Sequence, residues 1–166
     1  MNFARILRHL TIGQWMLRRA FPATTLASIE QTIQQSEMSH SGEICFAVEG
    51  ALNTFALIKN QTARERAIEV FSQLRIWDTE QNNGVLIYLL LADRDVEIIV
   101  DRGIHNKVSN EELENICRTM ESAFRQQQFG AGIIQGIHTI SQHLKMHFPY
   151  DPMQDKNELT NKPMIL

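Results

Sequence analysis

The sequence predicts an α/β fold, a three-layer α/β/α sandwich in which helices flank a small mixed β-sheet. Three observations lead to this fold class. The chain has 166 residues, enough for one domain of ordinary size. Two short apolar runs enclose a helical pattern, which predicts two parallel strands joined by a right-handed crossover. A polar turn then separates the second run from an alternating segment, which predicts an antiparallel hairpin.

A basic segment opens the chain, because four arginines and no acidic residue precede Glu30. Apolar residues recur there at spacings of three and four, which predicts a short amphipathic helix over residues 2–10 that also carries Arg5 and Arg8. The segment 1–21 has two interpretations. It covers its own domain, or it lies on an anionic lipid surface.

The domain proper is expected over residues 22–149. A proline suits the first turn of a helix over residues 22–38. The apolar run 43–48, bounded by glycines, predicts a largely buried first strand. A Thr-Ala-Arg-Glu capping box opens the crossover helix over residues 62–76.

The second half of the domain begins with the strongest strand signal. Residues 85–91 are apolar on both faces, which predicts a central strand, and the alternating residues 96–100 complete the hairpin. A second capping box opens a helix over residues 109–128, and a last helix ends before Pro149. Residues 150–166 are expected to form a polar, loosely ordered tail.

Composition excludes several classes of protein. There are 16 Lys and Arg against 19 Asp and Glu, a net charge of −3, so no nucleic-acid partner is expected. No apolar run reaches the length of a membrane-spanning helix, and the start lacks a secretory signal pattern. The expected location is therefore cytoplasmic, with peripheral contact at the inner membrane through residues 1–21 as an addition. Cys45 and Cys117 both fall in apolar patterns and are expected to be buried thiols.

The predicted topology brings three chain segments to one edge of the sheet, where the first and second strands start and the third ends. The side chains expected at this edge include Glu43, Asp78, Asn82, Asn83, Asp101 and Arg102. Carboxylate and amide oxygens are the ligands that Ca²⁺ and Mg²⁺ prefer, so the edge is a candidate cation site. The alternative is that these residues simply form turns, where Asp and Asn are common.

Several segments together resemble the TPM domain family. They are HSGEI (40–44), RERA (64–67), NGVLIY (83–88), ADRDVEI (92–98), DRGI (101–104) and HFP (147–149). The resemblance covers about residues 25–149 and is to the short bacterial form without a signal peptide or membrane anchor. It implies an α/β/α sandwich with an acidic, metal-binding cleft, whose matching positions here are Asp78, Asn82, Asn83 and Asp101.

The family spans an enzyme and an interaction module, since one branch is associated with acid phosphatase activity and another assists a membrane receptor. Two hypotheses follow. In the first, Ca²⁺ or Mg²⁺ held by Asp78, Asn82 and Asp101 polarises a phosphoester, Arg102 neutralises its charge, and Glu43 or Asp78 activates water. In the second, the domain is non-catalytic and binds a membrane-associated protein or a membrane surface.

Overall fold

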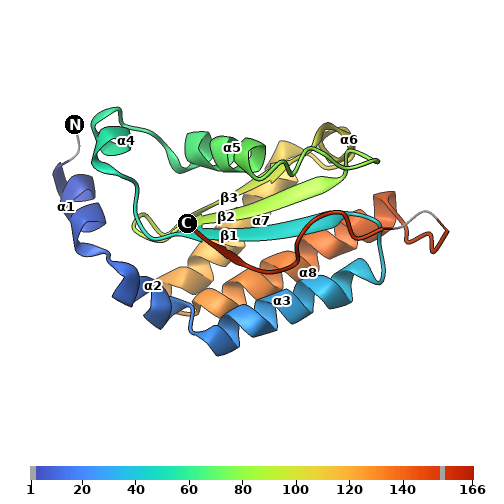
Figure 1. The fold of residues 1–166 in the computed structure, drawn as a ribbon, viewed down its shortest axis with the longest axis horizontal. Coiled ribbons are helices and arrows are strands. Elements are labelled where there is room, and N and C mark those ends of the chain that lie inside the picture. Colours follow the sequence, from blue (N-terminus) through green and yellow to red (C-terminus); the bar gives the residue numbers. More distant parts are fainter. Residues whose placement is uncertain (1–2, 154–155) are drawn as a thin grey trace.

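The fold is a four-stranded sheet between two layers of helices (Figure 1). This computed structural model describes residues 3–153 and 156–166. Along the described residues the elements are α1 (Phe3–Thr11), α2 (Gln14–Ala20), α3 (Ala23–Glu37), β1 (Glu43–Glu49), α4 (Thr54–Ile58), α5 (Ala63–Gln73), β2 (Gly84–Leu90), β3 (Asp95–Val100), α6 (Arg102–His105), α7 (Asn110–Arg125), α8 (Phe129–His147) and β4 (Met164–Ile165).

The sheet is mixed and has the strand order β3-β2-β1-β4. β1 and β2 are parallel, with register running from Glu43 opposite Gly84 to Glu49 opposite Leu90. β2 and β3 are antiparallel, and β4 is parallel to β1. The predicted sandwich, with its parallel crossover and antiparallel hairpin, is therefore confirmed.

Two apolar cores lie on opposite faces of the sheet, because side chains alternate along each strand. In β2, Val85 and Ile87 belong to the core formed with α3, α7 and α8, whereas Leu86 and Tyr88 belong to the core under α5. Figure 1 shows α5 on one side of the sheet and α3 and α8 on the other. All of β2 is buried, as expected of a central strand.

Both predicted capping boxes are present. The Thr62 side chain accepts a hydrogen bond from the backbone N–H of Glu65 while the Glu65 carboxylate accepts one from that of Thr62, and Ser109 and Glu112 do the same at the start of α7. These reciprocal bonds satisfy N–H groups that an α-helix leaves without partners at its first turn.

The C-terminal segment differs from the expected loose tail. It returns along β1, where Met164 and Ile165 pair with Ala47 and Val48 as β4. The reason is that β1 would otherwise present an open edge, and a strand edge left unpaired is a liability. Met164 also packs against the core under α5, so the apolar residues of this short polar segment supply the contact.

Short elements were also missed. The structure adds α4, α6 and α2, each of seven residues or fewer. Single-turn helices of this kind carry too few periodic positions for a pattern to show. Of the helix expected over residues 2–10, position 2 lies outside the described residues and the rest is in α1. Within the described part of the chain, no helix has both the length and the apolar character needed to span a bilayer.

Candidate functional site

The edge that the sequence singles out is formed by the starts of β1 and β2 and the end of β3. The backbone N–H of Glu43 donates to the carbonyl of Asn83 at 3.2 Å, and the N–H of Asp101 donates to the carbonyl of Gly84 at 2.9 Å. These ladder bonds bring the three segments together, since parallel β1 and β2 start at the edge where antiparallel β3 ends.

Asp101, Arg102 and Asn82 form one connected group at this edge. Asp101 is the N-cap of α6, and its Oδ1 accepts from the backbone N–H of Arg102 at 2.6 Å. The Arg102 Nε donates to Asn82 Oδ1 at 2.9 Å. Asn82 has a left-handed backbone with φ of 51°, and its carbonyl accepts from Gly103 N–H at 3.0 Å. A Cβ at Gly103 would lie 2.5 Å from that carbonyl, so this approach requires glycine.

Asn83 lies beneath this group and is 1% exposed. Its Nδ2 donates to the carbonyl of Ser41 at 2.5 Å, and its backbone N–H donates to Thr79 Oγ1 at 3.1 Å. Two buried oxygens at this edge have no hydrogen-bond partner among the described residues, namely Oδ1 of Asn83 and Oδ2 of Asp101. Oxygens of this type suit Ca²⁺ or Mg²⁺, so the residues fit a hard cation in donor chemistry.

The Asp78 and Glu43 carboxylates contact residues outside this group. The Asp78 carboxylate pairs with the Arg75 guanidinium at 2.7 Å and its side chain is 52% exposed. The Glu43 carboxylate is buried and accepts from the backbone N–H groups of Glu158 and Leu159 at 3.2 and 3.1 Å. Over residues 3–153 and 156–166, no cluster of three His, Cys, Asp or Glu side chains could hold a metal ion.

A nucleophile with an adjacent base is also missing from the described residues of this edge. The Ser41 hydroxyl donates to Gln81 Oε1 at 3.0 Å rather than to the neighbouring His40. Burial lowers the pKa of His40 to about 4, so its imidazole is neutral near pH 7. In this structure Ser41 is therefore not paired with His40 as a nucleophile is with its base.

The opposite edge of the sheet holds a polar cluster that sequence reasoning missed. In the turn after β2, the Asp93 carboxylate pairs with Arg5 at 2.9 Å, with Arg8, and with His9 Nε2 at 3.2 Å. The His9 Nδ1 accepts from Leu52 N–H at 3.0 Å, which leaves the ring proton on Nε2, facing Asp93. Burial lowers the pKa of His9, so this neutral form is favoured. The run of arginines without acids was the only available signal.

A cavity of about 1,020 Å³ adjoins this cluster, between α1, α2, the β2–β3 turn and α7. Its lining combines Trp15 with four arginines, including Arg19, Arg94 and Arg125, and with carboxylates such as Glu121. It lies at the carboxyl ends of the parallel strands, where open α/β sheets generally bind ligands. The cation site predicted from the sequence lies at the other edge.

Asp95 also lines this cavity. Burial, with repulsion from the Glu97 and Asp93 carboxylates, raises the pKa of Asp95 to about 6. Burial and the Asp95 charge likewise raise the pKa of Glu121. Two carboxyl groups that disfavour each other's ionisation thus face this end of the molecule.

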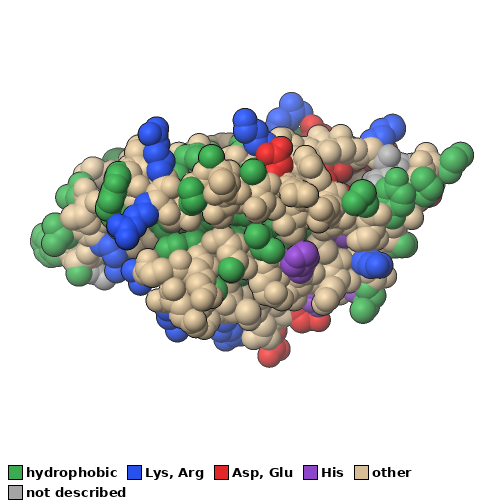
Figure 2. All heavy atoms as spheres, turned by 90° about the horizontal axis from the view of Figure 1, so that it is seen from below, with side chains coloured by type: hydrophobic (Ala, Val, Ile, Leu, Met, Phe, Trp, Pro, Cys, Tyr) green, Lys and Arg blue, Asp and Glu red, His purple; other side chains and the backbone are tan. Residues whose placement is uncertain are grey.

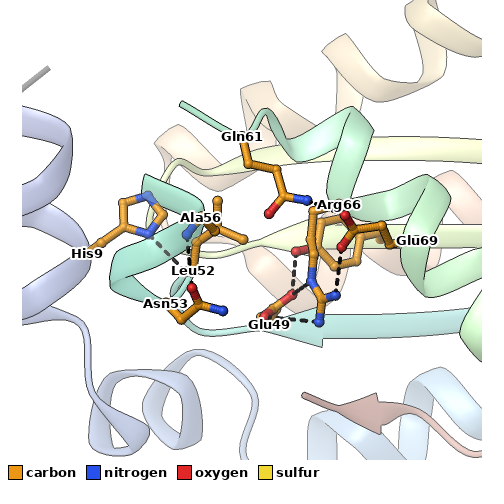
Figure 3. A network of polar contacts seen from close by, with 9 residues as sticks. His9, Glu49, Leu52, Asn53, Ala56, Gln61, Arg66 and Glu69 are labelled. Atoms are coloured by element: carbon orange, nitrogen blue, oxygen red, sulfur yellow. Dashed lines mark hydrogen bonds and ion pairs between the residues drawn. The ribbon is translucent and has the colours of Figure 1, made fainter. Parts of the chain in front are cut away.

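Glu49 at the end of β1 is held by a separate network, shown in Figure 3. Its carboxylate accepts from Arg66 Nε at 2.8 Å and from the Tyr88 hydroxyl at 2.7 Å. Arg66 also pairs with Glu69 at 3.1 Å on the same helix. Burial raises the pKa of Tyr88. The network ties β1 and β2 to α5 and engages the carboxylates of both Glu49 and Glu69.

The cysteines carry no reactive chemistry. Burial is the main reason that the pKa of Cys45 and that of Cys117 are each raised to about 12, so both remain protonated thiols. Both are free of disulfides; Cys45 is buried, as expected from its apolar pattern, whereas Cys117 is half-buried rather than buried.

Comparison with known proteins identifies the family to which this chain belongs. The model of the TPM domain matches residues 18–143, so the chain belongs to the TPM domain family. A search of the curated proteins finds no match.

Two solved structures share the fold. The NMR structure of the BA42 protein from the psychrophilic bacterium Bizionia argentinensis is 28% identical over 88% of this chain and 95% of that one, with a TM-score of 0.77. The N-terminal domain of a P. gingivalis protein, also an NMR structure, is 16% identical over 78% of this chain and 81% of that one, with a TM-score of 0.60. The second likeness supports the fold alone.

Proposed function

We propose that this TPM domain binds one divalent cation, Ca²⁺ or Mg²⁺, at the edge formed by Asn82, Asn83 and Asp101, and that the site acts on a phosphoester. The strongest support is the pair of buried oxygens without partners, Oδ1 of Asn83 and Oδ2 of Asp101. Leaving a buried carboxylate oxygen unpaired is costly, and a cation would satisfy it.

The chain's own residues would divide the remaining roles. A bound cation supplies Lewis-acid polarisation of a phosphoryl oxygen. Arg102 uses Nε to hold Asn82, which leaves its terminal guanidinium nitrogens to pair with phosphate. Of the two carboxylates expected to activate water, Asp78 is the accessible one, because Glu43 is only 4% exposed and already accepts two backbone N–H groups.

The first prediction concerns cation binding by the full chain. Titration of the metal-free protein with Ca²⁺ and with Mg²⁺, followed by NMR, should shift the amides of residues 79–84 and 101–103 together. Asp101→Asn keeps an oxygen to cap α6 but removes the charge, so it should weaken binding about tenfold or more. Glu114→Gln removes one charge from an exposed pair on α7 and should leave affinity unchanged.

The site would be refuted if the chemical shifts of those amides did not change at millimolar cation. It would also be refuted if the Asp101→Asn protein bound the cation with equal affinity. The reaction is tested separately with p-nitrophenyl phosphate and the cation that binds best. Release of nitrophenol should disappear in Asp101→Asn and Asp78→Asn and persist in Glu114→Gln. Cation binding without any hydrolysis would remove the phosphoester part of the proposal and leave a binding domain.

A further inference from the structure

Helix α1 is docked on the domain by its polar side. Arg5, Arg8 and His9 all reach Asp93, and His9 is 3% exposed. An amphipathic helix that only covered its own domain would turn its apolar stripe inward. Here the charged contact to Asp93 sets the opposite orientation.

The apolar stripe of α1 consequently faces outward. Phe3, Leu7 and Leu10 are 72%, 65% and 68% exposed, and only Ile6 of the four stripe residues packs against a core. Large apolar side chains gathered at one place on a surface mark an interaction site more often than single ones do.

Helix α2 follows α1 and anchors this end of the chain to the domain. Leu17 lies in α2 and Phe21 comes just after it. These side chains are 1% and 2% exposed and belong to the core formed with α3 and α8. Trp15 and Met16 are 67% and 37% exposed and line the mouth of the cavity beside Asp93. The exposed residues are thus carried by anchored helices rather than by a loose end.

Two arginines accompany these apolar side chains on α2. Arg18 and Arg19 are exposed and form no ion pair within the described residues. The Cζ atom of the Arg19 guanidinium lies 5.6 Å from the centroid of the Trp15 ring. Residues 3–21 include no acidic side chain. Figure 2 shows hydrophobic side chains beside Lys and Arg at the end of the molecule where α1 and α2 lie in Figure 1.

We propose that this α1–α2 surface, made by Phe3, Leu7, Leu10, Trp15 and Met16 with Arg18 and Arg19, docks on a bilayer that contains anionic lipid. Leucine, phenylalanine and tryptophan side chains enter the boundary between headgroups and acyl chains, while arginines contact lipid phosphates. The occupant is a lipid surface rather than a second copy of the chain. In a two-fold dimer through this patch, the arginines of one copy would face and repel those of the other copy. The patch offers no acidic side chains to pair with them.

The experiment is co-sedimentation of the full chain with vesicles of phosphatidylcholine alone or mixed with phosphatidylglycerol, in EDTA. Binding is expected only to the anionic vesicles. Leu7→Gln with Leu10→Gln, and separately Arg18→Gln with Arg19→Gln, should each lower the partition coefficient about tenfold or more. The matched control is Met38→Gln with Met146→Gln, two side chains that are 69% and 74% exposed outside this surface, and it should bind like the original chain.

A spectroscopic readout tests insertion directly. In a Trp77→Phe background, which leaves Trp15 as the single tryptophan, emission should move to shorter wavelength with anionic vesicles. No binding to anionic vesicles, or equal loss in the Met38 and Met146 control, would overturn the proposal. So would a dimer in sedimentation velocity that the Leu7 and Leu10 changes dissolve, because a second copy would then be the occupant. EDTA keeps the outcome independent of the cation site.

Discussion

Single residues show how burial governs charge in this domain. Asp93 and Asp95 are both half-buried, yet Asp93 has two arginines and a histidine around it, and those partners hold its pKa below the usual range despite burial. Asp95 lacks such partners, and its pKa rises to about 6. Both carboxylates come after the end of β2, so the difference between their pKa values arises from their neighbours.

Asp95→Asn should therefore stabilise the protein in a pH-dependent way. A carboxyl group with a pKa of about 6 when folded and 3.8 when unfolded contributes stability below pH 3.8 that is lost as pH rises through 6. The amide cannot ionise, so the variant should gain about 1 to 3 kcal/mol in free energy of unfolding at pH 7. The gain should vanish near pH 4.

Urea unfolding of the original chain and of Asp95→Asn at pH 4, 5 and 7 measures the difference in their free energies of unfolding. Contributions from the other titrating groups are common to both proteins and cancel in this difference. Glu114→Gln, from an exposed pair, serves as the control and should show a difference that is small at every pH. A stability gain for Asp95→Asn that is as large at pH 4 as at pH 7 would contradict the pKa assignment.

At the scale of the element, α1 illustrates that amphipathic patterning does not fix orientation. The same periodicity is compatible with an inward or an outward apolar stripe. The Arg5 and Arg8 pairs with Asp93, together with the His9 contact to Leu52, decide between the two. Burying the stripe instead would leave Asp93 without its partners.

Asp93→Asn should consequently loosen α1 while the sheet stays intact. The amide keeps an acceptor oxygen but removes the charge that Arg5 and Arg8 contact, a loss of about 1.5 to 3 kcal/mol. Since the Leu52 amide is bonded to His9, its hydrogen exchange should accelerate, whereas amides within β2 should be unaffected. NMR-detected exchange checks both.

Asp78→Asn is the comparison for this experiment, because the Arg75–Asp78 pair is exposed and should cost no more than about 1 kcal/mol. Unaltered exchange at Leu52 in Asp93→Asn would mean that apolar contacts, not the carboxylate, position α1.

For the whole molecule, the sheet places two distinct surfaces at its two ends. The Asn82, Asn83 and Asp101 group lies where β1 and β2 start, and the α1–α2 surface lies beyond their carboxyl ends. The C-terminal segment closes the outer edge of β1 with β4, and the backbone N–H groups of Glu158 and Leu159 bind Glu43 at the first of these ends.

A chain that stops at Lys162, without β4, should be less stable and should self-associate. Loss of the Met164 packing and of the β1 pairing should lower the free energy of unfolding by about 2 to 4 kcal/mol, and the open edge offers a template for other chains. Urea unfolding and light scattering measure the two effects. Met153→Ser, at a side chain that is 91% exposed, is the control and should change neither.

Local patterns predicted most of the sheet and the long helices. The apolar run at 85–91, the hairpin after it and the two capping boxes are signals within a few residues, and each corresponds to an observed element. The sequence also predicted that Gly84 and Asp101 lie at one edge of the sheet, because the handedness of the crossover and the geometry of the hairpin constrain the topology. The roles of Asp78 and Glu43 at that edge stay predictions.

Long-range contacts were decided by the tertiary structure alone. Arg5 and Asp93 are 88 positions apart, and Glu43 and Leu159 are 116 apart, so no local period links them. The sequence by itself determined β1, β2, β3 and the long helices, because their signals depend on neighbouring residues, whereas β4, α2, α4 and α6 were not predicted. Which way α1 faces, and what covers the edge of β1, depend on electrostatic and edge-pairing energies between distant segments, and only the folded chain sets those.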